Sequence, residues 1–329
     1  MTARPAMTAA AADNRGSRFS ASHMSAVAVI VVMAAWPGAI ASSESFLLYV
    51  GTLVVLYSVG AMSLHLVFRM GQVSFAHAAF LGIGGYTSAL LLTGSGLSWP
   101  LAFCASGLVS GLFGLLLGPI VLRLRGVYFV LFTFILCEFA ERVFTDWGSL
   151  TNGAGGVAGI PAPPAFSSPV SFYYLCLGVA VLCALICRGV LKSDVGEAID
   201  AIRTSESLAE SNGVPVFRIK VAIFAISCLL VGFQGALQAS FVHYISPASY
   251  TFDESLRFVV MNVIGGMNSL WGPVLGSVFI IALPELLRNW VEYQWVLYGV
   301  VLVLAMRYLP GGLYELGERA SALLRKGGA

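Results

Sequence analysis

Residues 192–220 read KSDVGEAIDAIRTSESLAESNGVPVFRIK, and this polar stretch decides how the rest of the chain is interpreted. It holds nine charged residues, in a chain of 329 residues with only 18 Lys and Arg and 16 Asp and Glu. The sequence on either side is apolar over runs that are longer than the helices of a soluble core. We therefore interpret residues 192–220 as a soluble element that is attached to a membrane-embedded body.

The composition of the whole chain indicates a membrane protein. Hydrophobic residues make up 58% and charged residues only 10%, whereas soluble domains carry about 25% charged residues. Continuous apolar runs of about 20 residues predict transmembrane helices and not the alternating strands of a β-barrel. The expected fold class is all-α, a polytopic transmembrane helical bundle of about 8–10 spans with one or two broken or re-entrant segments. A net charge of +2 gives no indication of nucleic acid as a partner. The apolar composition instead predicts that membrane lipid surrounds the chain.

The hydrophobic runs predict candidate spans at 24–41, 46–68, 74–93, 99–122, 126–144, 170–190, 219–243, 256–284 and 293–308. Ala-Ile-Ala at 39–41, followed by two serines, is also typical of a signal-peptide cleavage site, so cleavage of the first run stays open. Residues 1–23 are predicted to form a disordered cytoplasmic tail, 24–308 the transmembrane domain, and 309–329 a basic cytoplasmic tail.

The distribution of Lys and Arg predicts the orientation of the chain. Basic residues follow the even-numbered runs and surround the polar stretch: Arg69, Arg123, Arg125, Arg188, Lys192, Arg203, Arg218 and Lys220. The loops at 93–98 and 145–169 contain none. Because cytoplasmic loops are enriched in Lys and Arg, residues 192–220 are predicted to be a cytoplasmic loop. The Gly- and Pro-rich stretch 148–164 is expected to contain no helix and to be a docking or gating loop, or a linker.

Segment 256–284 is predicted to be discontinuous. The basic C-terminal tail is cytoplasmic only if this segment enters the membrane and returns to the same face. Its centre, MNVIGGMNSLWGP, contains Gly265, Gly266, Gly272 and Pro273 between two apolar halves. Such a break is tolerated where protein or a wet cavity covers the freed backbone groups.

A short sequence similarity links this break to an earlier one. Residues 71–75, GQVSF, resemble residues 266–270, GMNSL. Similar broken segments in two halves of a transporter point to a site between repeats. Candidates for a translocation path are therefore Gln72, Ser74, His77, Asn262, Gly265, Gly266, Asn268 and Ser269. For His77, a structural hydrogen-bonded role and a role as a ligand both stay open.

The run at 126–144 carries Glu138, a carboxylate that is costly if it faces lipid. Pairing with Arg142, one turn along, is the simplest structural explanation. A proton relay is the alternative, and it suits an ion-coupled secondary transporter of a small polar or zwitterionic solute. The sequence has no phosphate-binding glycine loop, no metal-spaced His and Cys set and no nucleophile elbow. The chain is thus expected to be no enzyme and to bind no cofactor or metal, so active transport needs an ion gradient or an ATPase on another chain.

Capping signals divide the polar stretch into two short helices. Asp194 is a candidate helix cap, and Glu197 three residues later completes a capping box. A second helix is predicted to start at Ser205 and to stop at Gly213, with the separation near Thr204. Either these helices form a coupling element inserted into a partner, or they lie on the lipid headgroups.

Five stretches occur in the order that is typical of one family: Gly71–Leu92, RLRGVYF at 123–129, 150–161, 201–214 and 263–276. Together they resemble the LivM-type permeases of branched-chain amino acid ABC importers, over about residues 45–310. The resemblance implies that 24–308 is a non-catalytic permease domain, multi-pass in the bacterial inner (plasma) membrane, that moves branched-chain or related amino acids into the cytoplasm.

The resemblance also implies partners. These are a second homologous permease, two cytoplasmic ATPase subunits that hold ATP and Mg, and a periplasmic solute-binding protein. It further implies that the loop at 192–220 couples to the ATPases through Ser205, Glu206, Leu208, Ala209, Glu210, Asn212 and Gly213. The broader E-A-A-x3-G pattern of ABC permeases is absent, because Gly213 follows Glu206 by seven residues.

Overall fold

The computed structural model describes residues 31–38, 45–286, 299–300, 303, 307 and 312–314. Backbone contacts divide the chain into Met1–Leu48 and Tyr49–Ala329. In the first unit residues 31–38 are helical, and Trp36 Nε1 donates a hydrogen bond to the Leu47 carbonyl over 3.3 Å. The predicted tails at 1–23 and 309–329 lie outside the described residues, apart from 312–314, and so does most of the predicted span at 293–308.

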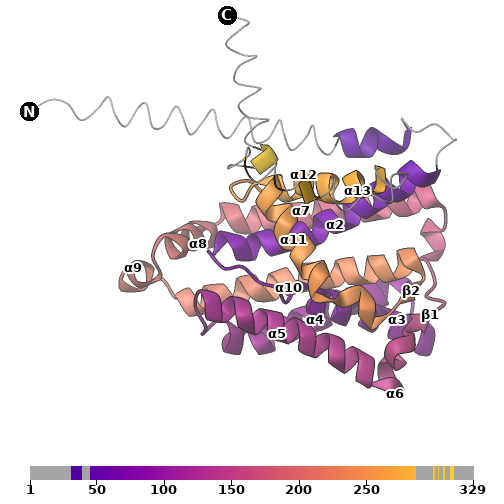
Figure 1. Ribbon diagram of the computed structural model, residues 1–329, viewed down its shortest axis with the longest axis horizontal. Helices are drawn as coiled ribbons and strands as arrows, with labels where there is room; N and C mark the ends of the chain where they lie inside the picture. The colour runs from indigo at the N-terminus through magenta and orange to yellow at the C-terminus, as the bar shows by residue number, and fades with distance from the viewer. Residues whose placement is uncertain are drawn as a thin grey trace, which may run out of the picture. The chain divides into compact units, whose positions relative to one another are not determined.

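Long helices make up most of the second unit, and the expected all-α class is confirmed (Figure 1). The long helices are α2 (Ser45–Arg69), α3 (His77–Gly94), α4 (Trp99–Val121), α5 (Val127–Asp146), α7 (Pro169–Lys192) and α10 (Val216–Val242). Each begins and ends within a few residues of a predicted span. Within the described part of the chain, α2, α4, α7 and α10 are long and apolar enough to cross a membrane, by length and composition. A helix of about 20 apolar residues covers the roughly 30 Å hydrocarbon core because it rises 1.5 Å per residue.

Short elements connect the long helices. They are α6 (Gly148–Thr151), η1 (Gly153–Gly155), β1 (Val157–Ala158), η2 (Pro164–Phe166), α8 (Asp194–Thr204), α9 (Glu206–Ser211), β2 (Tyr244–Ile245), η3 (Pro247–Tyr250), α11 (Phe252–Gly265), α12 (Gly272–Ser277), the π-helical turn η4 (Val278–Ala282) and α13 (Leu283–Leu286). Strands β1 and β2 pair antiparallel, with Val157 opposite Ile245. The expectation that 148–164 contains no helix is wrong for α6, because Thr151 N donates to the Trp147 carbonyl over 3.0 Å and closes one helical turn.

Helices α3, α4 and α10 pack through glycines. A Cβ at Gly84 on α3 would lie 2.5 Å from Gly232 Cα on α10, and one at Gly114 on α4 would lie 2.6 Å from Cys228 Cβ. Lipid tails are as apolar as leucine, so helices in a membrane associate through close packing, which small residues permit. These three helices therefore form the most closely packed part of the bundle.

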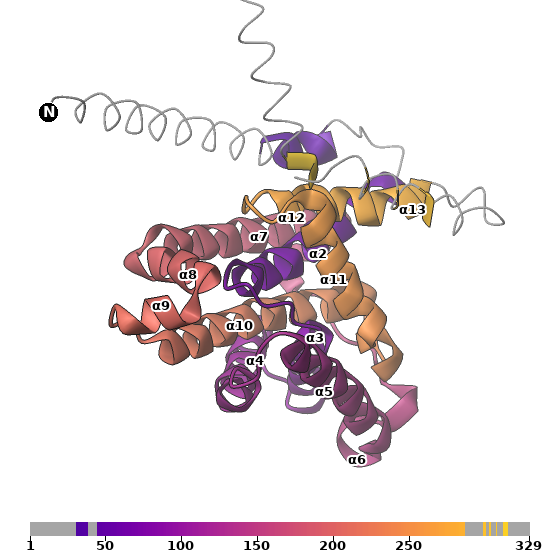
Figure 2. The same ribbon diagram turned by 60° about the vertical axis from the view of Figure 1, so that its left-hand side comes forward.

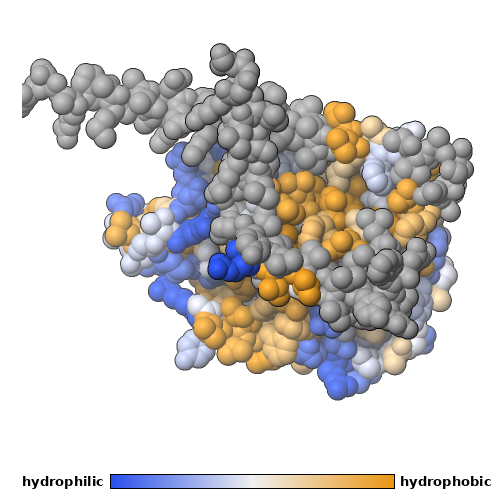
Figure 3. Space-filling model, turned by 45° about the horizontal axis from the view of Figure 1, so that its top comes forward, coloured by the Kyte–Doolittle hydropathy of each residue, from blue (hydrophilic) through white to orange (hydrophobic). Residues whose placement is uncertain are grey.

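The connections gather at two opposite ends of the bundle. Helices α8 and α9 lie at one end, beside the ends of α7 and α10, and β1, β2 and α6 lie at the other (Figures 1 and 2). On the face drawn in Figure 3, apolar residues form broad patches, and hydrophilic residues gather mainly at the left and lower right of the view. Broad apolar patches suit a body that is surrounded by lipid.

Segment 256–284 is discontinuous, as predicted. Helix α11 stops at Gly265 and α12 starts at Gly272. The two helices form an antiparallel hairpin in close contact, because a Cβ at Gly276 would lie 2.7 Å from the carbonyl carbon of Met261. At 14 residues, or about 21 Å, α11 is too short to cross the hydrocarbon core. The return of this hairpin to one membrane face stays a prediction.

Candidate functional site

Buried polar side chains line the middle of α2. We call this set the polar column and define it by Tyr57, Ser58, Ser63 and His65 of α2, His77 of α3, Ser227 and Gln234 of α10, and Glu254, Asn262 and Ser277 of the α11–α12 hairpin. All ten are buried. From Tyr57 to His65 the column extends about 12 Å along the helix. It is therefore a polar region within an otherwise apolar body.

One end of the column is a buried carboxylate. Glu254 is only 7% exposed, and its Oε1 accepts a hydrogen bond from the Tyr57 hydroxyl. Arg257 Nη1 lies 3.6 Å from the other carboxylate oxygen. Glu254 belongs to the first turn of α11, where the helix dipole favours negative charge. Next along the column, the hydroxyls of Ser58 and Ser277 lie 2.6 Å apart and join α2 to α12.

Two amides face the centre of α2. Asn262 Nδ2 donates to the Ala61 carbonyl over 3.0 Å and to the Phe258 carbonyl over 2.9 Å, while its Oδ1 makes no hydrogen bond with any described residue. Gln234 lies against Gly60, where any Cβ would overlap its Oε1. Neither polar atom of Gln234 makes a hydrogen bond within the described chain. The amide of Gln234 is thus buried with its full hydrogen-bonding capacity unused.

The histidines occupy the other end of the column. His77 Nε2 lies 2.8 Å from Ser227 Oγ, and that hydroxyl donates to the Ser63 carbonyl over 2.6 Å. Because the single Ser227 proton goes to Ser63, Nε2 of His77 must carry the proton that joins the two side chains. Nδ1 of His77 lacks a hydrogen-bond partner among the described residues. The ring of His65 lies beside the Asn262 amide, but neither ring nitrogen makes a hydrogen bond of good geometry with the described residues.

These unsatisfied groups indicate what the column can do. A buried polar group without a partner costs about 1–3 kcal/mol, and polar residues inside a membrane protein usually mark a path for solute or ions. The column offers the acceptor Asn262 Oδ1, the amide of Gln234 and the ring nitrogens of His65. Donors and acceptors of this kind can replace the water around a small polar or zwitterionic solute.

The two predicted breaks share a backbone feature. Gly71 has a φ of +79° and Gly266 a φ of +109°, and each begins a non-helical connection. A side chain at either position would be strained because such φ values favour glycine. The two aligned glycines therefore share a positive φ.

The candidate path residues divide into two groups. Gln72, Ser74, His77 and Asn262 are buried, and His77 and Asn262 belong to the polar column. Residues 265–266 lie at the bend of the hairpin. By contrast, Asn268 is exposed and Ser269 is half-buried, where its Oγ accepts from Trp271 N over 3.3 Å. The structure therefore does not bring Asn268 and Ser269 to the column.

Sequence reasoning missed the central members of the column. His65 and Gln234 each stand alone in a long apolar run, and Glu254 precedes the predicted start of the broken segment. An ionisable or amide side chain within a span is costly against lipid, and this signal would have selected His65 and Gln234.

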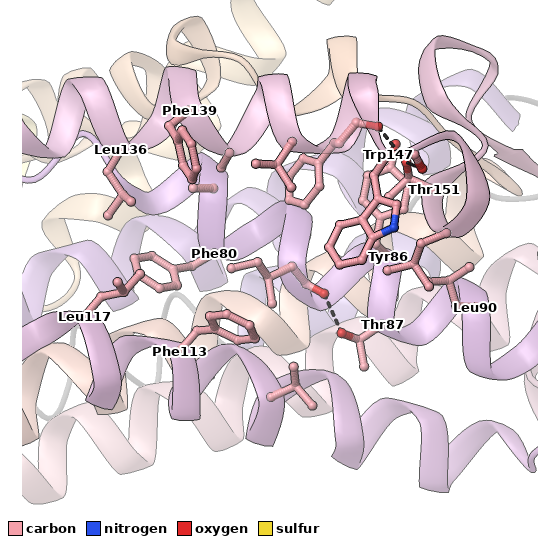
Figure 4. Close-up of a pocket in the computed structure, with 17 residues that line it drawn as sticks. Phe80, Tyr86, Thr87, Leu90, Phe113, Leu117, Leu136, Phe139, Trp147 and Thr151 are labelled. Atoms are coloured by element: carbon pink, nitrogen blue, oxygen red, sulfur yellow. Dashed lines mark hydrogen bonds between the residues drawn. The ribbon is translucent and has the colours of Figure 1, made fainter.

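A second feature is a half-open pocket of about 380 Å³ among α3, α4 and α5, which we call the apolar pocket. Two of its lining residues, Phe139 and Trp147, are 64% and 51% exposed. In Figure 4 Phe80, Phe113 and Phe139 point into it from three helices, and Trp147 lies at one end. Its lining is almost entirely aliphatic and aromatic. None of the candidate path residues lines it.

The polar loop at 192–220 forms two helices, as predicted, and α8 ends at Thr204. The Ser205 hydroxyl accepts from Leu208 N over 3.4 Å and caps α9, which ends before Gly213. The predicted capping box at Asp194 and Glu197 is wrong. The cap residue of α8 is Ser193, and its hydroxyl donates to the Val190 carbonyl over 2.8 Å instead of accepting from the helix.

The predicted coupling residues face two directions. Ala209 is buried against Ile202 and Val216. Glu206 forms ion pairs with Lys220 and, over 3.2 Å, with Arg125, so it points toward the membrane body. The other members are exposed, except for the half-buried Ser205: Leu208, Glu210, Asn212 and Gly213.

The predicted pairing of Glu138 with Arg142 is wrong. Both side chains are exposed on α5, and no ion pair joins them in the described structure. Within the described residues there is also no group of three or more His, Cys, Asp and Glu side chains that could hold a metal ion.

Comparison with known proteins defines the class. Residues 46–306 match the family model described as branched-chain amino acid transport system / permease component. The chain therefore belongs to this family of membrane permeases, as its sequence motifs indicated.

Individual relatives agree with this class. The high-affinity branched-chain amino acid transport system permease proteins LivM of Salmonella typhimurium and Escherichia coli are both 30% identical, over 92% of this chain and 77% of each relative. The ribose import permease protein RbsC of Bacillus subtilis is 28% identical over 49% of this chain and 49% of its own length. No solved structure matches the chain.

Proposed function

We propose that the chain is the membrane permease subunit of a bacterial ATP-driven importer for branched-chain or related amino acids. The observation that carries the proposal is the family match over residues 46–306, which covers most of the predicted body and all of the polar loop. The identity of 30% to two LivM permeases supports the amino-acid substrate. The inner (plasma) membrane is its proposed location, in agreement with four helices that are long and apolar enough to cross a bilayer among the described residues.

The polar column is proposed as the route of the solute. An amino acid carries an ammonium and a carboxylate, and burying either without hydrogen bonds is very costly. Asn262, Gln234 and His65 offer unused hydrogen-bonding atoms at the centre of the body. The apolar side chain of the solute finds Phe258 beside Gln234, since both approach Gly60.

The proposed partners take the two ends of the bundle. Two cytoplasmic ATPases, which hold ATP and Mg²⁺, are assigned to α8 and α9, where Leu208 is 65% exposed. Val195 and Phe217 of the polar loop are also exposed, and several exposed apolar side chains on one loop suit a protein contact. A periplasmic solute-binding protein is assigned to the opposite end, and a second, homologous permease completes the pore. This chain itself is proposed to catalyse no reaction.

Reconstitution in liposomes tests the proposal. The chain is purified alone, and also with two ATPases, a second permease and a secreted solute-binding protein from the same organism. We expect ATP-dependent leucine uptake by the complete assembly and none by the chain alone. Uptake by the chain alone, driven by an ion gradient, would show a secondary transporter and contradict the proposal.

A further inference from the structure

The polar loop is joined to the membrane body by three ion pairs. Asp200 of α8 accepts from Arg69, the last residue of α2, over 2.6 Å. On α9, the two carboxylate oxygens of Glu206 contact different cations, Oε1 with Lys220 and Oε2 with Arg125. Lys220 lies near the start of α10, and Arg125 lies in the connection between α4 and α5.

Two of these helices are the ones that carry the polar column. Arg69 is one turn beyond His65 on α2. Lys220 is two turns before Ser227 on α10. A helix moves as a nearly rigid rod over such distances, so a displacement at Arg69 or Lys220 reaches the column directly.

We propose that Asp200 and Glu206 are positioning residues that transmit the movement of α8 and α9 to the polar column. This inference rests on the proposed function, because the movement comes from the partner ATPases. Its content is that these two carboxylates do not bind the partner. Both oxygens of Glu206 already contact cations of this chain, which leaves exposed residues such as Leu208 for the partner.

The two attachments differ in strength. The Lys220 side chain is 3% exposed and that of Glu206 22%, so separating them leaves a buried ammonium without its partner. Asp200 is 55% exposed, and water competes with Arg69 for its carboxylate. We infer that α9 stays bound to α10 throughout the cycle, whereas α8 exchanges its contact with α2. A loop that is fixed to one helix and releasable from the other changes the distance between these two helices. Part of the column, Ser63 with Ser227 and Gln234 beside Gly60, lies where α2 meets α10.

Asp200→Asn is the main test, because this exposed pair can be removed without leaving a buried charge. The matched control is Glu197→Gln, which neutralises an exposed carboxylate one turn earlier on α8 with no ion pair in the described structure. The complete transporter is reconstituted, and three quantities are measured: ATPase bound per permease, ATP hydrolysed in response to solute-loaded binding protein, and solute imported per ATP.

We expect Asp200→Asn to keep the ATPases bound and to lower solute imported per ATP by about fivefold, the lower range of typical coupling effects. Exchanging the charges in Arg69→Asp with Asp200→Arg restores most of the import per ATP. Glu197→Gln changes it by less than about twofold.

The inference is overturned if Asp200→Asn imports as much solute per ATP as Glu197→Gln, or if it loses the ATPases, which would place Asp200 at the partner contact. Glu206→Gln paired with Lys220→Met provides the second variant, because it removes both members of the buried pair together. We expect it to keep the ATPases and lose import per ATP, and loss of the ATPases would contradict the role given to Glu206. A wild-type assembly without ATP-dependent import would instead refute the proposed function, and this inference with it.

Discussion

The polar column along α2 and the apolar pocket among α3, α4 and α5 are two regions of the same helical body, the first buried and the second half open, and they differ in what they can accept. The pocket has a volume of about 380 Å³ and a lining that is almost entirely apolar. The column is packed between helices, yet the amide of Gln234 and the ring of His65 are buried there with hydrogen-bonding atoms unused. The walls of the column and of this pocket thus differ in chemistry.

For a zwitterionic solute the chemistry of the wall matters more than its volume. A cavity can be opened by shifting helices, but an apolar wall cannot replace the water around an ammonium or a carboxylate. We therefore assign transport to the polar column. The predictions that follow compare substitutions in the polar column with substitutions in the apolar pocket.

The largest expected effect comes from closing the column at Gly60. A side chain there would overlap Gln234 Oε1, and even its Cβ would lie 2.5 Å from the Phe258 ring. We expect Gly60→Leu to abolish leucine uptake and to lower the free energy of unfolding by about 1–3 kcal/mol through overpacking. The control is Gly178→Leu on α7, where nothing lies within 4 Å of the added Cβ. Uptake by Gly60→Leu equal to that of Gly178→Leu would remove the column as the route.

The second effect separates function from stability. Gln234→Leu keeps the approximate shape of the side chain and removes a buried amide that has no partner in the described structure. We expect uptake to fall about 10- to 100-fold, which corresponds to a lost hydrogen bond to a charged group, while thermal stability stays equal or rises.

The matched change in the pocket is Thr87→Val, which also replaces a polar group by an apolar one of similar shape. Thr87 Oγ1 donates only to the Ile83 carbonyl of its own helix, over 2.7 Å. Uptake by Thr87→Val should stay within about twofold of wild type, because this hydroxyl makes a local bond with little net worth. Equal losses of uptake in Gln234→Leu and Thr87→Val would show that the polar column and the apolar pocket do not differ in function.

The smallest effect is expected from filling the pocket. Ala140 lines it from α5, and Ala140→Leu adds apolar volume where the cavity can take it. The free energy of unfolding of the purified protein should stay equal or rise by about 0.5–2 kcal/mol, as is common for cavity filling. Uptake should not change. A strong loss of uptake would indicate that the solute passes through the pocket.

The long helices could be predicted from sequence because each needs only about 20 consecutive apolar residues. The break in 256–284 could be predicted for a similar local reason. Gly265, Gly266 and Gly272 allow two helix ends to touch, and in the structure a Cβ at Gly272 would lie 2.9 Å from the Gly265 carbonyl oxygen.

The site was predicted less well because its members meet only in three dimensions. His77 and Asn262 were selected as polar residues near breaks, but Gln234 reaches Gly60 from 174 positions away in the sequence. The direction of Glu206 could not be predicted either. The residues next to Glu206 in the sequence indicate only that α9 is polar. The cations that bind Glu206 come from α10 and from the α4–α5 connection.

Cysteine labelling in the working transporter tests the central claim most directly. Single cysteines are placed at Ser63 in the column and at Ala140 in the pocket, in an active background without the six native cysteines. A charged, water-soluble thiol reagent is added with and without ATP and leucine. The account predicts that Ser63→Cys is labelled during ATP turnover and protected by leucine, while Ala140→Cys is not labelled. Labelling and leucine protection at position 140, with none at position 63, would contradict it.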